Sequence, residues 1–266
     1  MEIRDRREDV AGIETFWREA DGAPVLYVHG NPTHSGDWLP FLERTGGAAI
    51  DLPGFGRSGK PADFDYSIGG YAGWLEAFRA RLGWDAYRLV VHDWGGVALA
   101  MAQREPERVE RLVVMDCVPF LPGYRWHLLA RIWRTRVIGE LFQGATTRPA
   151  LKLVMRAAKS GKGGMPDAFI DRIWDHYDHG TQRAILKLYR SAPPDVLARA
   201  GERLGEIKAP ALVVWGADDP FIPTRFGHAY GEALGGETTV EVVEDANHWP
   251  WIDRPELVAR VCEFLG

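Results

Sequence analysis

Short apolar runs alternate with longer amphipathic stretches along most of the chain. Helical spacing of apolar residues is clear over Tyr71–Leu82, and Ile13–Trp17 alternates weakly, as an edge strand would. The runs with the length of buried strands are Pro24–Val28, Ala48–Ile50, Arg88–Val91, Arg111–Met115, Ala211–Trp215 and Thr239–Val243. Strands that alternate with helices predict an α/β fold, with a mostly parallel central sheet covered by helices on both faces.

This alternation stops in the middle of the chain. From about Pro119 to Leu204 there is no strand-like run, and Trp, Arg and Leu follow helical spacing instead. We interpret residues 119–205 as a helical cap subdomain inserted into a core domain of residues 1–118 and 206–266. Such a cap would lie over the carboxyl ends of the strands, where open α/β sheets place their sites.

The stretch after Arg88–Val91 is the most informative one in the sequence. The apolar run leads to Asp93, and Gly95 and Gly96 then precede a helical pattern. A sharp turn between a strand and a helix that exposes one reactive side chain is a nucleophile elbow, here with Asp in place of Ser. An acidic N-cap of the following helix would produce the same local pattern. Other segments of the sequence are needed to distinguish a nucleophile elbow from an N-cap.

Three further segments stand where an elbow enzyme needs them. His29–Pro32 ends an earlier strand, and the backbone N–H of Asn31 would form an oxyanion hole with that of Trp94. Asp219 follows a later strand, and His248 follows the last one. Nucleophile, acid and histidine therefore occur in the chain order that elbow hydrolases use, each at the end of a predicted strand.

Two other patterns favour structural roles. Gly54–Lys60 has the spacing of a dinucleotide-binding loop and nearly matches a Walker A loop, but Pro61 stands where Ser or Thr is required and no helical pattern begins before about Ile68. His176 and His179 have no third ligand cluster and fit a solvated helix face. We therefore predict neither a nucleotide cofactor nor a metal.

Composition narrows the choice of partners. The chain has 266 residues and a net charge of −5, without any block of like charges, so nucleic acid and anionic membranes are poor candidates. No apolar run could span a bilayer, and Met1–Glu8 is charged, unlike a signal peptide. Cys117 and Cys262 indicate no disulfide framework. We expect a cytoplasmic monomer or homodimer whose partners are a small apolar substrate and water.

From His29–Pro32 to His248 the chain resembles the α/β-hydrolase superfamily. Within it, His92–Gly95 matches the His-Asp-Trp-Gly of the Asp-nucleophile branch, which contains epoxide hydrolases and haloalkane dehalogenases. No Gly-x-Ser-x-Gly occurs, which argues against an esterase or lipase. The resemblance implies an α/β-hydrolase fold with an inserted helical cap.

The resemblance leaves two activities open. Asn31 and Val91 are typical of the dehalogenases, in which an Asn at this place and the elbow Trp, here Trp94, hold the halide with side-chain N–H groups. Leu188–Arg190 is similar to the Tyr-Arg element of epoxide hydrolases, whose Tyr, here Tyr189, protonates the opening ring. The alternative for Tyr189 is a tyrosine on a helix face of the cap.

Epoxide hydrolases also have a second ring-opening Tyr earlier in the cap. Leu141 and Phe142 stand about where this residue is expected, so the second Tyr is not evident. Tyr124 and Tyr177 are the candidates to replace it.

The chemistry follows from the residue types. An sp³ carbon with a leaving group needs a nucleophile that is ionised at neutral pH, and Asp93 qualifies because the ordinary pKa of Asp is about 3.9. Attack would form a covalent ester on Asp93, which water activated by His248 would hydrolyse. We assign Asp219 as the acid that orients His248, with Asp116 at the end of the sixth strand as the alternative.

Our leading interpretation is an epoxide hydrolase that converts apolar epoxides to vicinal diols, with Tyr189 as the general acid. The alternative is a haloalkane dehalogenase with its halide site at Asn31 and Trp94. A binding protein that has lost turnover is disfavoured, because all three members of the triad are present.

Overall fold

One eight-stranded sheet forms the centre of the protein. The computed structural model describes residues 1–156 and 165–266, and its strands follow the order β1-β2-β4-β3-β5-β6-β7-β8. Strand β2 pairs antiparallel with β1 and β4, and all other neighbours are parallel. The predicted α/β class and mostly parallel sheet are confirmed. The strands are β1 (Arg4–Val10), β2 (Ile13–Ala20), β3 (Val25–Val28), β4 (Gly47–Ile50), β5 (Tyr87–His92), β6 (Val109–Met115), β7 (Ala211–Gly216) and β8 (Thr238–Val243).

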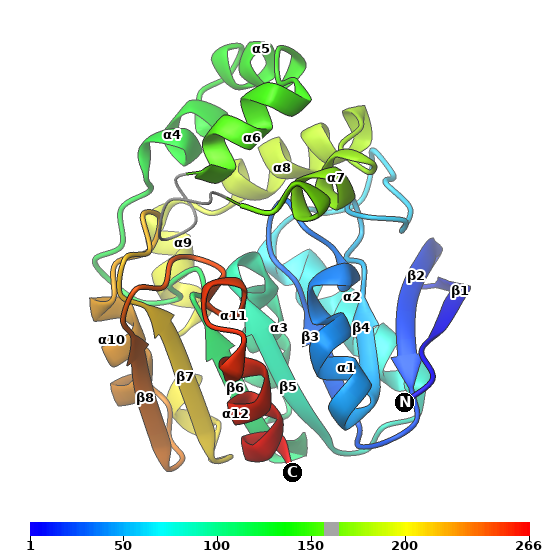
Figure 1. Cartoon of the computed structure of the whole chain (residues 1–266), viewed down its shortest axis with the longest axis vertical. Coiled ribbons are helices and arrows are strands. Elements are labelled where there is room, and N and C mark those ends of the chain that lie inside the picture. Colours follow the sequence, from blue (N-terminus) through cyan, green and yellow to red (C-terminus); the bar gives the residue numbers. More distant parts are fainter. Residues whose placement is uncertain (157–164) are drawn as a thin grey trace.

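Helices cover both faces of this sheet (Figure 1). Helices α1 (Leu39–Thr45) and α12 (Glu256–Leu265) pack together on one face, and α2 (Ile68–Leu82) and α3 (Val97–Ala102) pack together on the other. Helix α10 (Arg225–Ala233) contacts β7 and β8. Every residue of β3 and β4 is buried. Strands covered on both faces are continuously apolar rather than alternating, which is the pattern that the sequence displays.

The edge of the sheet beside β2 differs from the prediction. The sequence predicts one edge strand near Ile13–Trp17, whereas the structure has an antiparallel hairpin of β1 and β2. Strand β1 is mostly charged, so no apolar alternation reveals it. Its cross-strand partners stabilise it instead: Arg6 donates to Glu19 at 2.7 Å and Arg7 donates to Glu14 at 2.6 Å.

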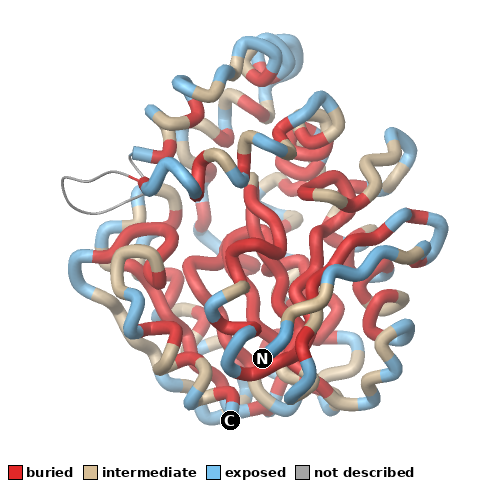
Figure 2. The backbone as a smooth tube through the Cα atoms, turned by 45° about the vertical axis from the view of Figure 1, so that its right-hand side comes forward, coloured by how far each residue is buried: buried red, intermediate tan, exposed pale blue. Residues whose placement is uncertain are grey.

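Within the described residues, the segment between β6 and β7 contains helices and loops but no strand. Figure 1 shows most of them above the carboxyl ends of the parallel strands, and Figure 2 shows the exposed backbone at the periphery around a buried sheet. None of the described helices is long and apolar enough to cross a membrane. The connecting helices are α4 (Leu128–Arg134), α5 (Ile138–Gly144), α6 (Arg148–Arg156), α7 (Asp167–Trp174), α8 (His179–Ser191) and α9 (Pro194–Ala200).

The glycine-rich segment 54–60 contacts these helices. The ammonium of Lys60 donates to the carbonyl of His176 at 3.0 Å and to Asp178 at 2.7 Å. The guanidinium of Arg183 donates to the carbonyl of Lys60 at 2.6 Å. The side chain of Lys60 therefore links the core to the loop before α8, and its backbone carbonyl links the core to α8 itself, which gives this segment a structural role.

Candidate active site

Asp93 lies at a sharp turn between β5 and η2 (Asp93–Gly96), a 3₁₀ turn that leads into α3. Its φ of 49° is in the left-handed region that residues other than Gly rarely adopt, as in a strained nucleophile elbow. A Cβ on Gly95 would lie 2.1 Å from the carbonyl oxygen of Val28, and one on Gly30 would lie 2.4 Å from Cβ of Asp93. Both glycines are therefore needed for the close approach of the elbow to the end of β3.

The loop after β3 brings a hydrogen-bond donor to the nucleophile. The backbone N–H of Asn31 donates to Oδ1 of Asp93 at 2.7 Å. His29 anchors the loop, because its Nε2 accepts from the N–H of Leu52 at 3.0 Å. The Asn31 N–H is thus placed as an oxyanion-hole donor to Oδ1. Within the described residues the other predicted donor, the backbone N–H of Trp94, makes no hydrogen bond to this carboxylate.

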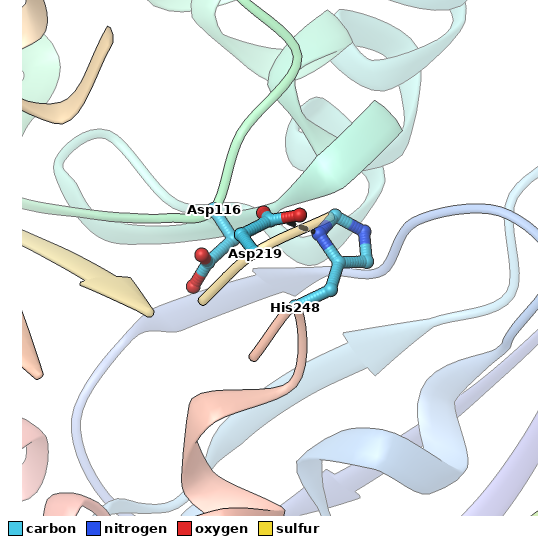
Figure 3. A group of neighbouring side chains, drawn as sticks. All are labelled: Asp116, Asp219 and His248. Atoms are coloured by element: carbon cyan, nitrogen blue, oxygen red, sulfur yellow. Dashed lines mark hydrogen bonds and ion pairs between the residues drawn. The ribbon is translucent and has the colours of Figure 1, made fainter. Parts of the chain in front are cut away.

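His248 lies between two carboxylates. Its Nδ1–H donates to Oδ2 of Asp219 at 2.8 Å, drawn as a dashed line in Figure 3, and its Nε2 lies 3.5 Å from Oδ2 of Asp93. The other oxygen of Asp219 accepts from the N–H groups of Phe221 at 2.7 Å and Ile222 at 3.0 Å, which orients the carboxylate. The structure thus brings together the three residues predicted as nucleophile, acid and histidine.

The charges of Asp93, His248 and Asp219 depend on one another. Burial opposes ionisation of Asp93, but the hydrogen bond and charge of His248 hold the pKa of Asp93 below its usual range. Burial likewise opposes protonation of His248, yet Asp219 and Asp93 raise the pKa of His248 well above its usual value. If Asp93 became an ester, its charge would disappear and the pKa of His248 would fall. The imidazole would then become a competent base.

Asp116 is beside Asp219 but does not bond to the histidine (Figure 3). Its Oδ1 accepts from the N–H of Gly216 at 2.9 Å. Burial and the charge of Asp219 raise the pKa of Asp116 well above its usual range, so this carboxyl is protonated more readily than an ordinary Asp. The ligand-type atoms of Asp116, Asp219 and His248 lie within 4.8 Å of one another, but Asp116 already bonds to Gly216 and Asp219 to His248, which makes the three a poor donor set for a cation.

Tyr189 extends from α8 to the loop after β3. Its hydroxyl accepts a hydrogen bond from Nδ2 of Asn31 at 3.2 Å. Its ring lies 5.1 Å from that of Trp94 and 4.9 Å from that of Trp133, measured between ring centroids. Burial and the charge of Asp93 raise the pKa of Tyr189 well above its usual value, so the hydroxyl keeps its proton.

A small cavity lies between Asp93 and the helices that connect β6 to β7. Its volume is about 70 Å³, measured as the space that the centre of a water molecule can occupy. The reactive groups Asn31, Asp93, Tyr189 and His248 lie on its wall. The rest of the wall is mostly apolar and aromatic, and it includes Val118, Leu129, Leu151, Met155 and Ile222. An apolar cavity with a few convergent polar groups is typical of a small-molecule site.

The candidates for a second ring-opening tyrosine face other acceptors. Tyr177 lines the cavity but donates to the side chain of Gln143. Tyr124 also lines it, with its hydroxyl 3.4 Å from a backbone carbonyl. Leu141 is exposed, and Phe142 lies on the cavity wall. Among the described residues that line the cavity, Tyr189 is the one tyrosine that contacts Asn31.

His92 contributes to the site in a way that sequence reasoning missed. Its Nε2 lies 2.7 Å from the carbonyl of His248, and its ring packs 4.8 Å from the His248 ring and 4.9 Å from that of Trp251. Burial lowers the pKa of His92 to about 3, so the ring is neutral and Nε2–H donates to that carbonyl. His92 therefore positions the loop that carries His248. The feature of the sequence that could have indicated this role is a histidine at the end of a buried strand, directly before the nucleophile.

The buried carboxyl of Asp37 makes the stability of the folded protein depend on pH. This carboxyl is buried, and burial raises the pKa of Asp37 to about 7, although Thr33 and the charge of Arg172 act in the other direction. In the unfolded chain the pKa of an Asp is about 3.9. The folded protein therefore binds the extra proton between about pH 4 and pH 7, and its stability falls as the pH rises through this range.

Replacing Asp37 by Asn should remove this fall in stability at rising pH, because Asn is neutral at every pH. We expect the free energy of unfolding of Asp37→Asn, relative to that of the wild type, to rise by about 2–3 kcal/mol between pH 5 and pH 8. Urea unfolding at both pH values measures the difference. Asp63→Asn, at an exposed position, is the matched control. A variant-minus-wild-type difference that does not change with pH would contradict the assignment.

Comparisons with known proteins agree with this architecture. Residues 23–255 match the model of the family described as alpha/beta hydrolase fold. The chain is 30% identical over 269 residues to a haloalkane dehalogenase of Mycolicibacterium paratuberculosis (strain ATCC BAA-968 / K-10), an alignment that covers 92% of this chain and 84% of that protein. It is 27% identical over 270 residues to epoxide hydrolase 1 of Caenorhabditis elegans, which covers 93% of this chain and 66% of that protein.

A solved structure has the same fold over nearly its whole length. The crystal structure of haloalkane dehalogenase DbeA from Bradyrhizobium elkani USDA94 aligns with a TM-score of 0.84 and 24% identity, and the alignment covers 99% of this chain and 98% of that one. The family match includes the elbow, the connecting helices and the loop of His248. As its sequence motifs predict, the chain belongs to the α/β-hydrolase family.

Proposed function

We propose that this protein is an epoxide hydrolase that converts small epoxides to vicinal diols. The observation that carries the proposal is the hydrogen bond from Nδ2 of Asn31 to the hydroxyl of Tyr189 at 3.2 Å. A hydroxyl that accepts a hydrogen bond still has its own proton to donate. An epoxide needs that proton, because its leaving alkoxide stays attached to the substrate and is a poor leaving group. A halide leaves without one.

Ring opening uses the groups on both sides of the cavity. Oδ2 of Asp93 attacks a ring carbon, the C–O bond of the ring breaks, and its electron pair goes to the oxygen, which takes the proton of Tyr189. The products are an ester on Asp93 and a Tyr189 phenolate that the amide of Asn31 stabilises. A positioned general acid of this kind contributes about 10²–10⁴ in rate.

Ester hydrolysis uses His248. Its proton returns to the Tyr189 phenolate through solvent, which leaves a neutral imidazole. The imidazole takes a proton from water, and the resulting hydroxide attacks Cγ of Asp93. The oxyanion formed on Oδ1 accepts the N–H of Asn31, a kind of donor worth about 10²–10³ in rate. Collapse of the intermediate breaks the bond from Cγ to the substrate oxygen, and that oxygen takes the proton of the new Asp93 carboxylic acid. The products are the diol, the Asp93 carboxylate and the His248 imidazolium.

Tyr189→Phe tests the proposal. We expect kcat/KM for diol formation from styrene oxide to fall about 10²- to 10⁴-fold, because the opening ring loses its proton donor. The matched control is Tyr177→Phe, which removes a cavity hydroxyl that faces Gln143 and should leave the rate near that of the wild type. Diol is followed by chromatography and bromide by ion assay, with styrene oxide and 1-bromobutane present together. Wild-type protein that releases bromide and forms no diol would refute the proposal.

One observation favours haloalkane dehalogenation as a second candidate. Nε1 of Trp94 is buried and has no hydrogen-bond partner within 3.5 Å among the described residues, although it is near enough to the Tyr189 hydroxyl to lower the pKa of that group. This N–H can therefore hold a halide with Nδ2 of Asn31. A halide would have to replace the Tyr189 hydroxyl as the acceptor of that amide. Under this alternative, Tyr189→Phe would retain or increase bromide release.

A further inference from the structure

Most of the polar side chains in the cavity that the mechanism does not use are already hydrogen bonded within the protein. Tyr177 donates to Gln143, the hydroxyl of Thr146 donates to a backbone carbonyl at 2.9 Å, and the indole N–H of Trp126 donates to another at 3.0 Å. These groups need no partner from a ligand.

His127 differs from them. Its Nδ1 accepts the N–H of Ala130 at 3.3 Å and caps α4. Burial lowers the pKa of His127 to about 4, so at neutral pH the ring is uncharged and its one proton is on Nε2. None of the hydrogen bonds of the described residues uses Nε2. The ring lies on the cavity wall, with its centroid 5.0 Å from that of Phe221, which is in turn 5.1 Å from that of His248.

Trp133 supplies a second uncommitted donor on the same cavity. Its side chain is 7% exposed, and its buried Nε1 has no hydrogen-bond partner among the described residues. Its ring lies 6.5 Å from that of His127 and 4.9 Å from that of Tyr189. A buried N–H without an acceptor has lost its hydrogen bonds to water and gained none in the protein, which destabilises the fold. The N–H of Trp133 thus has no acceptor within the described residues and Nε2 of His127 makes no hydrogen bond among them, so a ligand in the cavity can supply an acceptor for both.

We propose that His127 and Trp133 bind an oxygen acceptor on the substrate, so that the preferred epoxides carry a neutral carbonyl group close to the ring. A carbonyl oxygen has two lone pairs and can accept both N–H groups. An anionic group is disfavoured, because no Lys or Arg is among the described residues that line the cavity and Asp93 is nearby. The epoxide part of this inference rests on the proposed function, whereas binding of the carbonyl does not.

The test compares 5,6-epoxyhexan-2-one with 5,6-epoxy-2-methylhex-1-ene, which has C=CH₂ in place of C=O. For the wild type we expect kcat/KM to be about tenfold higher for the ketone, through a lower KM. His127→Asn keeps a side-chain oxygen to cap α4 but withdraws the ring N–H. Trp133→Phe keeps an aromatic ring without its N–H. Each variant should lose the preference for the ketone, so that its kcat/KM values for the two epoxides become about equal.

A binding measurement separates this inference from the proposed function. The affinities of hexan-2-one and 2-methylhex-1-ene are measured by calorimetry, and thermal unfolding controls for folding of each variant. If neither epoxide is turned over but hexan-2-one binds more tightly and His127→Asn or Trp133→Phe abolishes the difference, the carbonyl subsite stands and the epoxide hydrolase proposal fails. Equal binding of the two ligands to the wild type, or a ketone preference that both variants retain, refutes the subsite.

Discussion

His248→Gln is expected to stop turnover with the substrate covalently attached to Asp93. Ring opening requires Oδ2 of Asp93 and the proton of Tyr189, whereas His248 is the base only for hydrolysis of the ester. Glutamine occupies similar space but cannot take a proton from water. The ester should therefore accumulate to one equivalent per protein chain.

Intact-protein mass spectrometry measures this adduct, and peptide mapping assigns it to Asp93. An epoxide adds its whole mass, whereas a haloalkane adds its mass without the hydrogen halide, so the same spectrum separates the two candidate activities. Because His248 is a main cause of the lowered pKa of Asp93, the incubation is carried out at pH 8 to keep the carboxylate ionised in the variant. Absence of an adduct with a substrate that the wild type consumes would exclude this mechanism.

Asp219→Asn should have the second largest effect. Its carboxylate accepts Nδ1–H of His248 at 2.8 Å and stabilises the imidazolium that forms when water is deprotonated. An amide in this place stabilises that charge poorly and can favour the wrong tautomer, which in a comparable triad costs about 10⁴ in rate. We expect ester hydrolysis to slow about 10³- to 10⁴-fold while ester formation continues, as single-turnover kinetics would measure.

Asp116→Asn is the matched control for this prediction. The raised pKa of Asp116 favours its uncharged form, and an Asn carbonyl oxygen can still accept the N–H of Gly216. Its effect on ester hydrolysis should be small beside that of Asp219→Asn. If the two variants lose activity equally, Asp116 shares the orienting role and the assignment of Asp219 alone is wrong.

Local patterns in the sequence were sufficient for the fold class. Covered parallel strands must be continuously apolar and helices must repeat near every third or fourth residue, so periodicity alone predicted the mostly parallel sheet. The elbow could also be predicted, because a turn this tight requires glycines shortly after Asp93 in the chain. Strand β1 could not be predicted, because its charged residues pair across the hairpin and show no alternation of apolar and polar positions.

The triad was predictable in part. The chain order of Asp93, Asp219 and His248 follows from the fold. The sequence favoured Asp219 as the acid but left Asp116 open as an alternative, because both follow strands. The tertiary structure separates them. The N–H of Gly216 bonds to Asp116, and two N–H groups turn the Asp219 carboxylate toward His248.

Local sequence patterns were enough for the parallel part of the sheet, the elbow and the reactive residue types, because each depends on neighbours in the chain. In sequence terms Asn31 favours dehalogenation and Tyr189 favours epoxide hydrolysis, and no local pattern relates them. Only the tertiary structure joins them in one hydrogen bond, across 158 positions. The packing of α8 over the loop after β3 decides which groups share the cavity, and that packing depends on contacts between distant segments, which neither periodicity nor motif spacing encodes.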